Sequence, residues 1–236
     1  MKIMKIWQKI KNFIIRMKIK KIEAPKDLEI QPVVEDKIKN IEKKLYIQPI
    51  EQAELNDMQK LEEILKVIGC SKTSIQKILK IENIDIQNFR KNLYELSCLD
   101  YSNLELTIII TQNMNLITMN NEILKEKIKK LDNYFTNKDI VKDLIYSNSN
   151  ILNENIEEIL ESTEDVFEDY GISIAQDPNI IIENSNILFI AKNKLINSLT
   201  IIREYAKTQE NFIRMILTDP IIIGIQDASL LEDYVE

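Results

Sequence analysis

The carboxylates of residues 157–169 are the side chains whose spacing could support chemistry. On a helix, Glu164 and Glu168 lie one turn apart, as do Asp165 and Asp169, so either pair could bind a cation or act in acid–base catalysis. A solvated acidic helix face produces such pairs without any ligand, and we favour that interpretation. We therefore expect no catalytic residue, no metal ligand and no cofactor.

The residue types that are scarce exclude several classes of enzyme. The chain of 236 residues contains no histidine, which excludes Ser–His and Cys–His hydrolysis, imidazole zinc sites and histidine proton shuttles. Its 3 glycines leave no Walker-type or dinucleotide-binding loop. Cys70 and Cys98 form no C-x-x-C pattern and are expected to be reduced thiols. We predict a protein that is not an enzyme.

Positive charge is concentrated in residues 1–22, which we call the basic arm. The arm contains eight basic residues and no acidic one, whereas the remaining 214 residues carry 23 basic and 38 acidic side chains. Its apolar residues recur every three or four positions, with lysines on the opposite side, which predicts an amphipathic helix. Lysines interrupt every apolar run, so the arm lacks the continuous stretch of about 20 apolar residues that spanning a membrane requires.

The arm supplies the candidate binding residues of the chain. Its apolar stripe could dock on the rest of the protein or on a partner, which is the interpretation we favour. Lysines on one face with Trp and Phe on the other also suit an anionic membrane interface, and lysines also bind nucleic-acid phosphates. We expect a cytoplasmic protein, with peripheral membrane attachment as an alternative. The candidate residues are Lys2, Lys5, Trp7, Lys9, Phe13, Arg16 and Lys20.

Residues 23–57 are expected to connect the arm to the rest of the chain. Pro25, Pro32 and Pro49 lie in this segment, and each disfavours helix at the preceding residue. An extended connector is predicted, with room for a short helix over residues 35–46. Residues 58–236 then form the predicted helical-repeat domain.

A first series of similar segments recurs in this domain at intervals of 35 or 36 residues. Each segment is a short apolar run opened by Asn or Asp, beginning at Asn113, Asn148, Asn184 and Asp219, with a weaker member around Asn83. Turn formation and helix capping explain these positions better than ligand binding by the amides. The runs Ile180–Ile182 and Ile221–Ile223 are accordingly expected in turns or short helices instead of strands.

A second series consists of hydroxyl residues placed to cap helices. Ser and Thr at a helix start accept a hydrogen bond from a free amide of the first turn. Gly69 and Gly171 each stand two residues before a member of the series and are expected to end the preceding helix in the left-handed conformation. The members are Ser71, Ser102, Thr136, Ser173 and Thr208.

Apolar stripes at helical spacing complete the prediction of the fold. Met58, Leu61 and Leu65 begin the first stripe, and Leu104 and Leu106 belong to a later one. One helix pair cannot bury such a stripe alone, so adjacent pairs must stack. We predict an all-α protein, an α-solenoid of about five helix-turn-helix repeats preceded by the N-terminal amphipathic helix.

The pattern resembles the mitochondrial transcription termination factor (mTERF) family over residues 58–226. Asp177-Pro178 and Asp219-Pro220 carry the resemblance, together with Gly69 and Gly171. The resemblance implies a basic groove that holds nucleic acid. The acidic charge of residues 23–236 opposes that function, because it repels phosphate.

Two functions follow as expectations. The first is a non-enzymatic scaffold or adaptor that binds a protein partner through the curved surface of its repeats. The alternative is a nucleic-acid-binding factor, related to transcription or RNA, that uses the basic arm. Steep salt dependence of binding would distinguish the alternative from the first.

Overall fold

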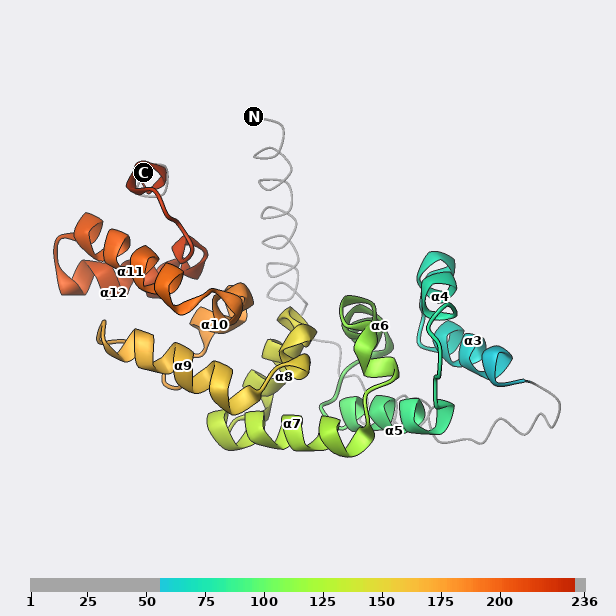
Figure 1. Ribbon diagram of the computed structural model, residues 1–236. Helices are drawn as coiled ribbons and strands as arrows, with labels where there is room; N and C mark the ends of the chain where they lie inside the picture. Colours follow the sequence, from blue (N-terminus) through green and yellow to red (C-terminus); the bar gives the residue numbers. More distant parts are fainter. Residues whose placement is uncertain (1–55, 232–236) are drawn as a thin grey trace, which may run out of the picture. The chain divides into compact units, whose positions relative to one another are not determined.

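Polar caps and apolar stripes divide residues 56–231, the part of the chain that the computed structural model describes, into consecutive helix pairs (Figure 1). No residue in this range lies in a β-strand, so the all-α prediction is confirmed. The pairs are α3 (Asp57–Val67) and α4 (Lys72–Ile78), α5 (Ile86–Ser97) and α6 (Asn103–Gln112), α7 (Asn121–Phe135) and α8 (Lys138–Ser147), α9 (Ile156–Glu168) and α10 (Asn179–Glu183), and α11 (Lys192–Ala206) and α12 (Gln209–Thr218).

Short 3-10 helices follow the second helix in all but the first of these pairs. The Asn- or Asp-opened segments of the sequence form them, with Asn113, Asn148, Asn184 and Asp219 at their N-caps. Asn83 differs, since it adopts a left-handed φ of 58° and no 3-10 helix follows it. These helices are η1 (Met114–Ile117), η2 (Ser149–Asn153), η3 (Ser185–Phe189) and η4 (Pro220–Ile222), and η5 (Ala228–Leu230) lies further on.

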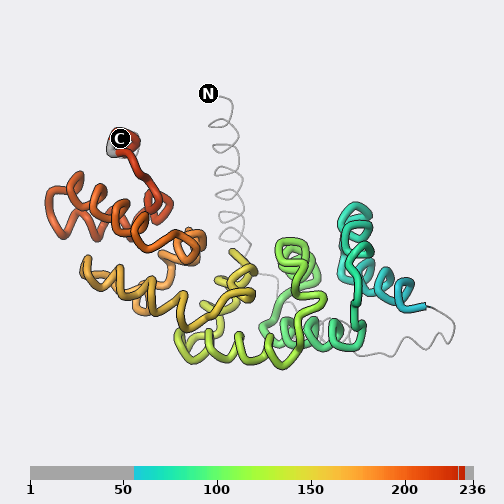
Figure 2. Tube along the Cα trace, viewed as in Figure 1, coloured from blue at the N-terminus to red at the C-terminus, as the bar shows by residue number. Residues whose placement is uncertain are grey.

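The pairs stack in the order of the sequence, as the Cα trace shows (Figure 2). The first helices form one layer, in which α3 contacts α5, α5 contacts α7, α7 contacts α9, and α9 contacts α11. The second helices form another layer, in which α6, α8, α10 and α12 contact one another in turn. Each apolar stripe is therefore covered by its neighbours, and the predicted α-solenoid is confirmed.

Three of the five predicted hydroxyl caps are confirmed. Ser71, Ser102 and Thr208 accept first-turn amides at 3.1, 3.3 and 3.2 Å, and Ser102 forms a full capping box. Thr136 is not a cap; it ends α7, and the neighbouring Asn137 caps α8. The prediction for Ser173 is also wrong, because α10 begins only at Asn179, after Pro178.

In every described helix pair, the turn between the two helices contains a residue in the left-handed conformation. Gly69 and Gly171 have φ values of 95° and 76°, as predicted. Asp100, Thr136 and Lys207 occupy the equivalent turns with φ values of 58°, 53° and 63°. A side chain at such a φ costs about 1–2 kcal/mol because Cβ approaches the following carbonyl oxygen. Three of the five turns therefore store local strain that the stacking of the pairs must offset.

The predicted stripes form the core, with two corrections. Leu61 and Leu65 are fully buried, whereas Met58, in the first turn of the first described helix, is 45% exposed. Leu104 is 70% exposed because it precedes the buried Leu106 by two positions, which places the two side chains about 200° apart around the helix. The runs Ile180–Ile182 and Ile221–Ile223 lie in short helices and turns, as expected.

Candidate interaction surfaces

The basic arm lies outside the described residues, and so do the seven binding candidates that the sequence places in it. The connector lies outside them as well, except for its last two residues. Within residues 56–231, no helix combines the length and the apolar character that crossing a membrane requires. The seven candidates are Lys2, Lys5, Trp7, Lys9, Phe13, Arg16 and Lys20.

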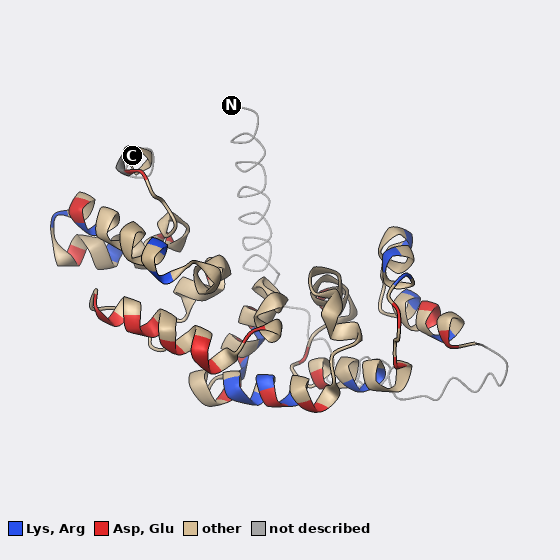
Figure 3. Cartoon of the chain, in the orientation of Figure 1, with Lys and Arg blue, Asp and Glu red and all other residues tan. Residues whose placement is uncertain are grey.

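Negative charge in the described part is concentrated on one helix. Residues 56–231 contain 18 basic and 27 acidic side chains. Seven of these acidic side chains, and no basic one, lie in α9 and the adjoining Asp169 (Figure 3). The other described residues carry 18 basic and 20 acidic side chains and are nearly neutral. The repulsion that an acidic protein exerts on phosphate is thus localised at α9.

Glu164 of α9 is occupied by contacts within the protein. Its carboxylate accepts hydrogen bonds from Ser173 Oγ at 2.5 Å and the Ile174 amide at 2.7 Å, which holds the loop between α9 and α10. Tyr134 of α7 donates to the same carboxylate at 3.2 Å. Burial, followed by the charge of Glu164, raises the pKa of Tyr134. Glu164 therefore has a structural role, and no cluster of metal-ligating residues occurs among the described residues.

Two of the four lysines of α7 form ion pairs with carboxylates. Lys125 lies 3.5 Å from Glu95 of α5, and Lys130 lies 3.1 Å from Glu157 of α9. These ion pairs join adjacent first helices of the solenoid. They leave α7 with less net attraction for phosphate than its lysine content suggests, because each paired cation must give up its carboxylate to bind another anion.

The lysines at α4 are free of such partners. Lys72 and Lys77 lie in α4 and Lys80 follows it, and the helix contains no acidic residue (Figure 3). Within residues 56–231, none of the three forms an ion pair. The first described pair thus carries three of the basic side chains of residues 56–231 that form no ion pair and are available to a phosphate ligand.

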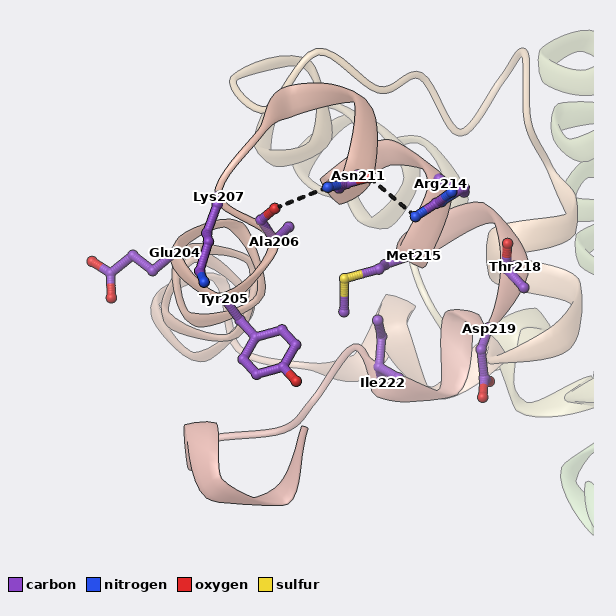
Figure 4. A pocket seen from close by; sticks show the side chains of 10 residues that line it. All are labelled: Glu204, Tyr205, Ala206, Lys207, Asn211, Arg214, Met215, Thr218, Asp219 and Ile222. Atoms are coloured by element: carbon purple, nitrogen blue, oxygen red, sulfur yellow. Dashed lines mark hydrogen bonds between the residues drawn. The ribbon is translucent and has the colours of Figure 1, made fainter. Parts of the chain in front are cut away.

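A pocket of about 830 Å³ lies on the last described pair. The ring of Tyr205 from α11, Met215 from α12 and Ile222 from η4 face one another across it (Figure 4). Lys207 and Arg214 also line the pocket. The sequence did not predict this pocket, because its walls come from three elements. A local sequence pattern does not show how these elements pack against one another.

Comparisons with known proteins agree with this architecture. The family model described as mTERF matches residues 34–235, which extends beyond residues 58–226 at both ends. A search of curated proteins finds no match for the chain. Stacked helix pairs with left-handed turns and Asp-Pro segments are the features on which the sequence resemblance rests. The chain belongs to the mTERF family.

Proposed function

We propose that this protein is a non-enzymatic helical-repeat protein that binds nucleic acid. Family membership supports this proposal, since a nucleic-acid ligand is usual for the family. The acidic composition of the chain is the main objection to it. The observation that carries the proposal is that α9 and Asp169 hold seven acidic residues, while the other described residues are nearly neutral.

Electrostatics then define where a phosphate backbone could lie. Repulsion between exposed charges fades beyond a Debye length of about 8 Å at physiological salt, so α9 excludes phosphate mainly from its own surroundings. The unpaired Lys72, Lys77 and Lys80 lie in the first described pair, whereas α9 belongs to the fourth. The eight cations of the basic arm supply further contacts. We therefore expect the arm and the first pair to contribute phosphate contacts.

A salt titration of the full chain tests the proposal. Fluorescence anisotropy with a labelled DNA duplex and a labelled single-stranded RNA should show binding at about 50 mM salt that weakens steeply by about 200 mM. Deleting residues 1–22 should lower the slope of log K against log salt by several units, up to about 0.9 for each duplex phosphate that the arm neutralises. Absence of binding to either nucleic acid at the lower salt concentration would refute the proposal.

A matched pair of variants tests the contribution of the first described pair. Lys72→Gln/Lys77→Gln removes two unpaired cations and should weaken binding on nucleic acids of any sequence. Lys60→Gln/Lys66→Gln removes two cations that already pair with Asp57 and Glu62 in α3, and should weaken binding less. Equal effects of the two variants would show that net charge alone matters and that α4 is not a contact surface.

Protein binding is a second candidate, favoured by the exposed face of α9. Glu161, Asp165 and Glu168 are exposed and follow helical spacing along one side of this helix. Such a stripe attracts a cationic polypeptide and repels phosphate. This candidate predicts capture of a Lys/Arg-rich peptide by the full chain, with loss of capture when the stripe is neutralised.

The membrane interpretation of the basic arm has its own test. Vesicles that contain anionic lipid should float the full chain and not the chain without residues 1–22, if the arm binds the interface. Flotation that is unchanged after the deletion would eliminate the arm as a membrane anchor. A nucleic-acid-binding arm would give salt-sensitive anisotropy whatever the outcome of flotation.

A further inference from the structure

We propose that α12, with the adjoining residues of α11 and η4, forms a docking surface for an acidic segment of a partner protein that also carries apolar side chains. The surface consists of two hollows that share Arg214 and Thr218, and we call it the α12 surface. The first hollow is the pocket of about 830 Å³ described above, and the second, of about 650 Å³, is lined by α12 alone. The inference does not depend on nucleic-acid binding.

Apolar side chains form the floor of the α12 surface. Tyr205 and Met215 are half-buried and Ile222 is buried, and their side chains converge in the first hollow (Figure 4). In the second hollow, Ile213 is half-buried and Leu217 is 43% exposed. Both volumes lie within the usual range of about 300–1,000 Å³ for binding sites. Two adjoining hollows along one helix suit successive apolar side chains of a polypeptide, whose burial removes apolar surface from water.

The side-chain types of the α12 surface are those of protein interfaces. Tyrosine, methionine and arginine are enriched at protein–protein interfaces, and tyrosine and arginine are enriched among the residues that contribute most binding energy. The first hollow contains one of each, in Tyr205, Met215 and Arg214. This composition supports a protein ligand.

The amide side chains of the surface are already engaged, which disfavours nucleic acid as the ligand. Free Asn and Gln amides are among the groups that read base edges. The Asn211 amide donates to Ala206 O at 3.4 Å, and its oxygen accepts from Arg214 at 3.0 Å. The Gln209 amide donates to Tyr170 O at 2.6 Å. Apolar contact and charge are therefore the interactions that the surface offers to a ligand.

Two cations give the surface its complementarity to carboxylates. Lys207 and Arg214 are exposed and flank Met215 in Figure 4. Within residues 56–231, neither of them forms an ion pair. The hydrogen bond from Arg214 to Asn211 orients the guanidinium at the first hollow, and a guanidinium has further N–H groups that can bind a carboxylate.

The acidic residues near the surface have other surroundings. Figure 4 shows the carboxylate of Glu204 pointing away from the first hollow. Asp219 is the N-cap of η4, where its carboxylate accepts the Ile221 amide at 3.3 Å. Glu210 lies in the first turn of α12, where the positive end of the helix dipole offsets its charge. A ligand carboxylate placed between Lys207 and Arg214 therefore meets cations first, and direct contacts outweigh more distant charges in salt solution.

Labelled peptides test the inference with the full chain. The probe is a fluorescein-labelled peptide of leucines separated by aspartates, and a matched peptide has serine in place of each leucine. Fluorescence anisotropy at low salt should show binding of the leucine–aspartate peptide. The serine–aspartate peptide should bind about tenfold more weakly, because it lacks the apolar side chains that the two hollows bury.

A matched pair of variants tests the role of the cations. Lys207→Gln/Arg214→Gln should weaken binding of the leucine–aspartate peptide about fivefold, as expected for the loss of two exposed ion pairs. The control Lys192→Gln/Lys194→Gln makes the same charge change at the start of α11, outside both hollows. It should change the affinity by less than about twofold, because its charges lie away from the peptide.

A second pair of variants tests the apolar floor. Leu217→Gln removes an apolar side chain of the second hollow and should weaken binding of the leucine–aspartate peptide about threefold. The control Ile196→Gln, at a position of α11 that is 38% exposed and outside both hollows, should leave the affinity unchanged. Circular dichroism checks that all four variants keep the helix content of the parent chain.

Three results with the peptides would overturn the inference. The first is absence of binding of the leucine–aspartate peptide to the full chain. The second is equal affinity for the leucine and serine peptides, which would show that charge alone attracts them. The third is an equal effect of a surface variant and its control in correctly folded protein.

Two further results would identify a different occupant and would also overturn the inference. A short single-stranded RNA that displaces the peptide, and whose own binding requires Lys207 and Arg214, would make the surface a phosphate site. A dimer of the chain that Lys207→Gln/Arg214→Gln dissociates, measured by analytical ultracentrifugation without peptide, would make a second copy the occupant. Monomeric protein and failure of the RNA to compete are the expected results.

Discussion

Asn92 of α5 accepts a hydrogen bond of 3.1 Å from the side-chain amide of Asn121 in α7, and both side chains are buried. The amide of Asn92 donates in turn to the carbonyl oxygens of Leu116 and Met119 at 2.9 and 2.7 Å. Buried backbone carbonyls that lie outside regular helix bonding need such partners. One asparagine thus joins its own helix pair to the end of η1 and the start of the next pair.

Replacing Asn92 should be strongly destabilising. We expect Asn92→Ala to reduce the free energy of unfolding by about 2–3 kcal/mol, because the carbonyl of Leu116 and the Asn121 amide lose their partner, while the carbonyl of Met119 keeps Asn88 as a donor at 2.6 Å. Urea unfolding followed by circular dichroism measures the loss. Asn133→Ala, at an exposed position of α7, serves as a control and should stay within about 0.5 kcal/mol. A loss at Asn92 as small as that at Asn133 would contradict the structural role.

Thr136 offers a stabilising substitution. Its left-handed φ of 53° is unfavourable for a β-branched residue, and glycine adopts this conformation without a Cβ clash. Thr136→Gly should raise the free energy of unfolding by about 0.5–1 kcal/mol, after the larger unfolded-state entropy of glycine is subtracted. Thr136→Ala keeps the Cβ and should gain less. Thermal unfolding that ranks alanine above glycine would contradict the strain at this turn.

Buried tyrosines should reduce stability at alkaline pH. Burial, followed by the nearby Glu105 and Asp143, raises the pKa of Tyr101 in the folded protein. The folded chain then holds more protons than the unfolded chain above pH of about 10, where a free tyrosine ionises, so the free energy of unfolding falls as pH rises.

Variants separate Tyr101 from the other tyrosines in that pH range. Tyr101→Phe should flatten the alkaline decline of stability, although it also loses a hydrogen bond of 2.6 Å to the carbonyl of Lys142. Tyr94→Phe, at an exposed position, should leave the slope unchanged. Urea unfolding at a series of pH values between about 8 and 11 measures both slopes. Identical slopes for the two variants would rule out a buried, neutral Tyr101.

Neutralising α9 should affect the two candidate ligand classes in opposite directions. Glu161→Gln/Asp165→Asn removes two exposed like charges one turn apart, which should leave the fold intact or slightly more stable. If nucleic acid binds, its affinity should rise, by no more than about tenfold at low salt. If a basic peptide binds α9, its affinity should fall. Glu183→Gln/Glu210→Gln makes the same charge change in the other helix layer and should have the smaller effect in either case.

Helix starts and stripes were predictable because they depend on local interactions. Ser71 and Ser102 bond to amides three residues away, and the buried leucines of α3 recur with the period of one helix. The error at Thr136 arose because two adjacent residues could both cap. Asn137 caps α8, so Thr136 becomes the left-handed residue that ends α7.

The sequence predicted only one of the two roles of the asparagines that open the 3-10 helices. Asn113 begins η1, as its position predicts, but its amide also donates to Ser149 O at 2.9 Å in the next unit. Asn184 likewise donates to Pro220 O at 2.9 Å. Donor and acceptor residue lie 36 residues apart, which matches the repeat spacing of the sequence. A local sequence pattern, however, does not show that these side chains form hydrogen bonds with the next unit.

The amino-acid sequence by itself determined the repeating helix pairs, because amphipathic periodicity, capping and left-handed glycines act within a few residues of the chain. Only the tertiary structure decided which charges remain available. Lys130 and Glu157 neutralise each other across α7 and α9, Glu164 holds a loop, and Lys72 remains unpaired. Composition counts all of these charges equally, whereas the field that a ligand meets depends on which of them face one another in the stacked pairs.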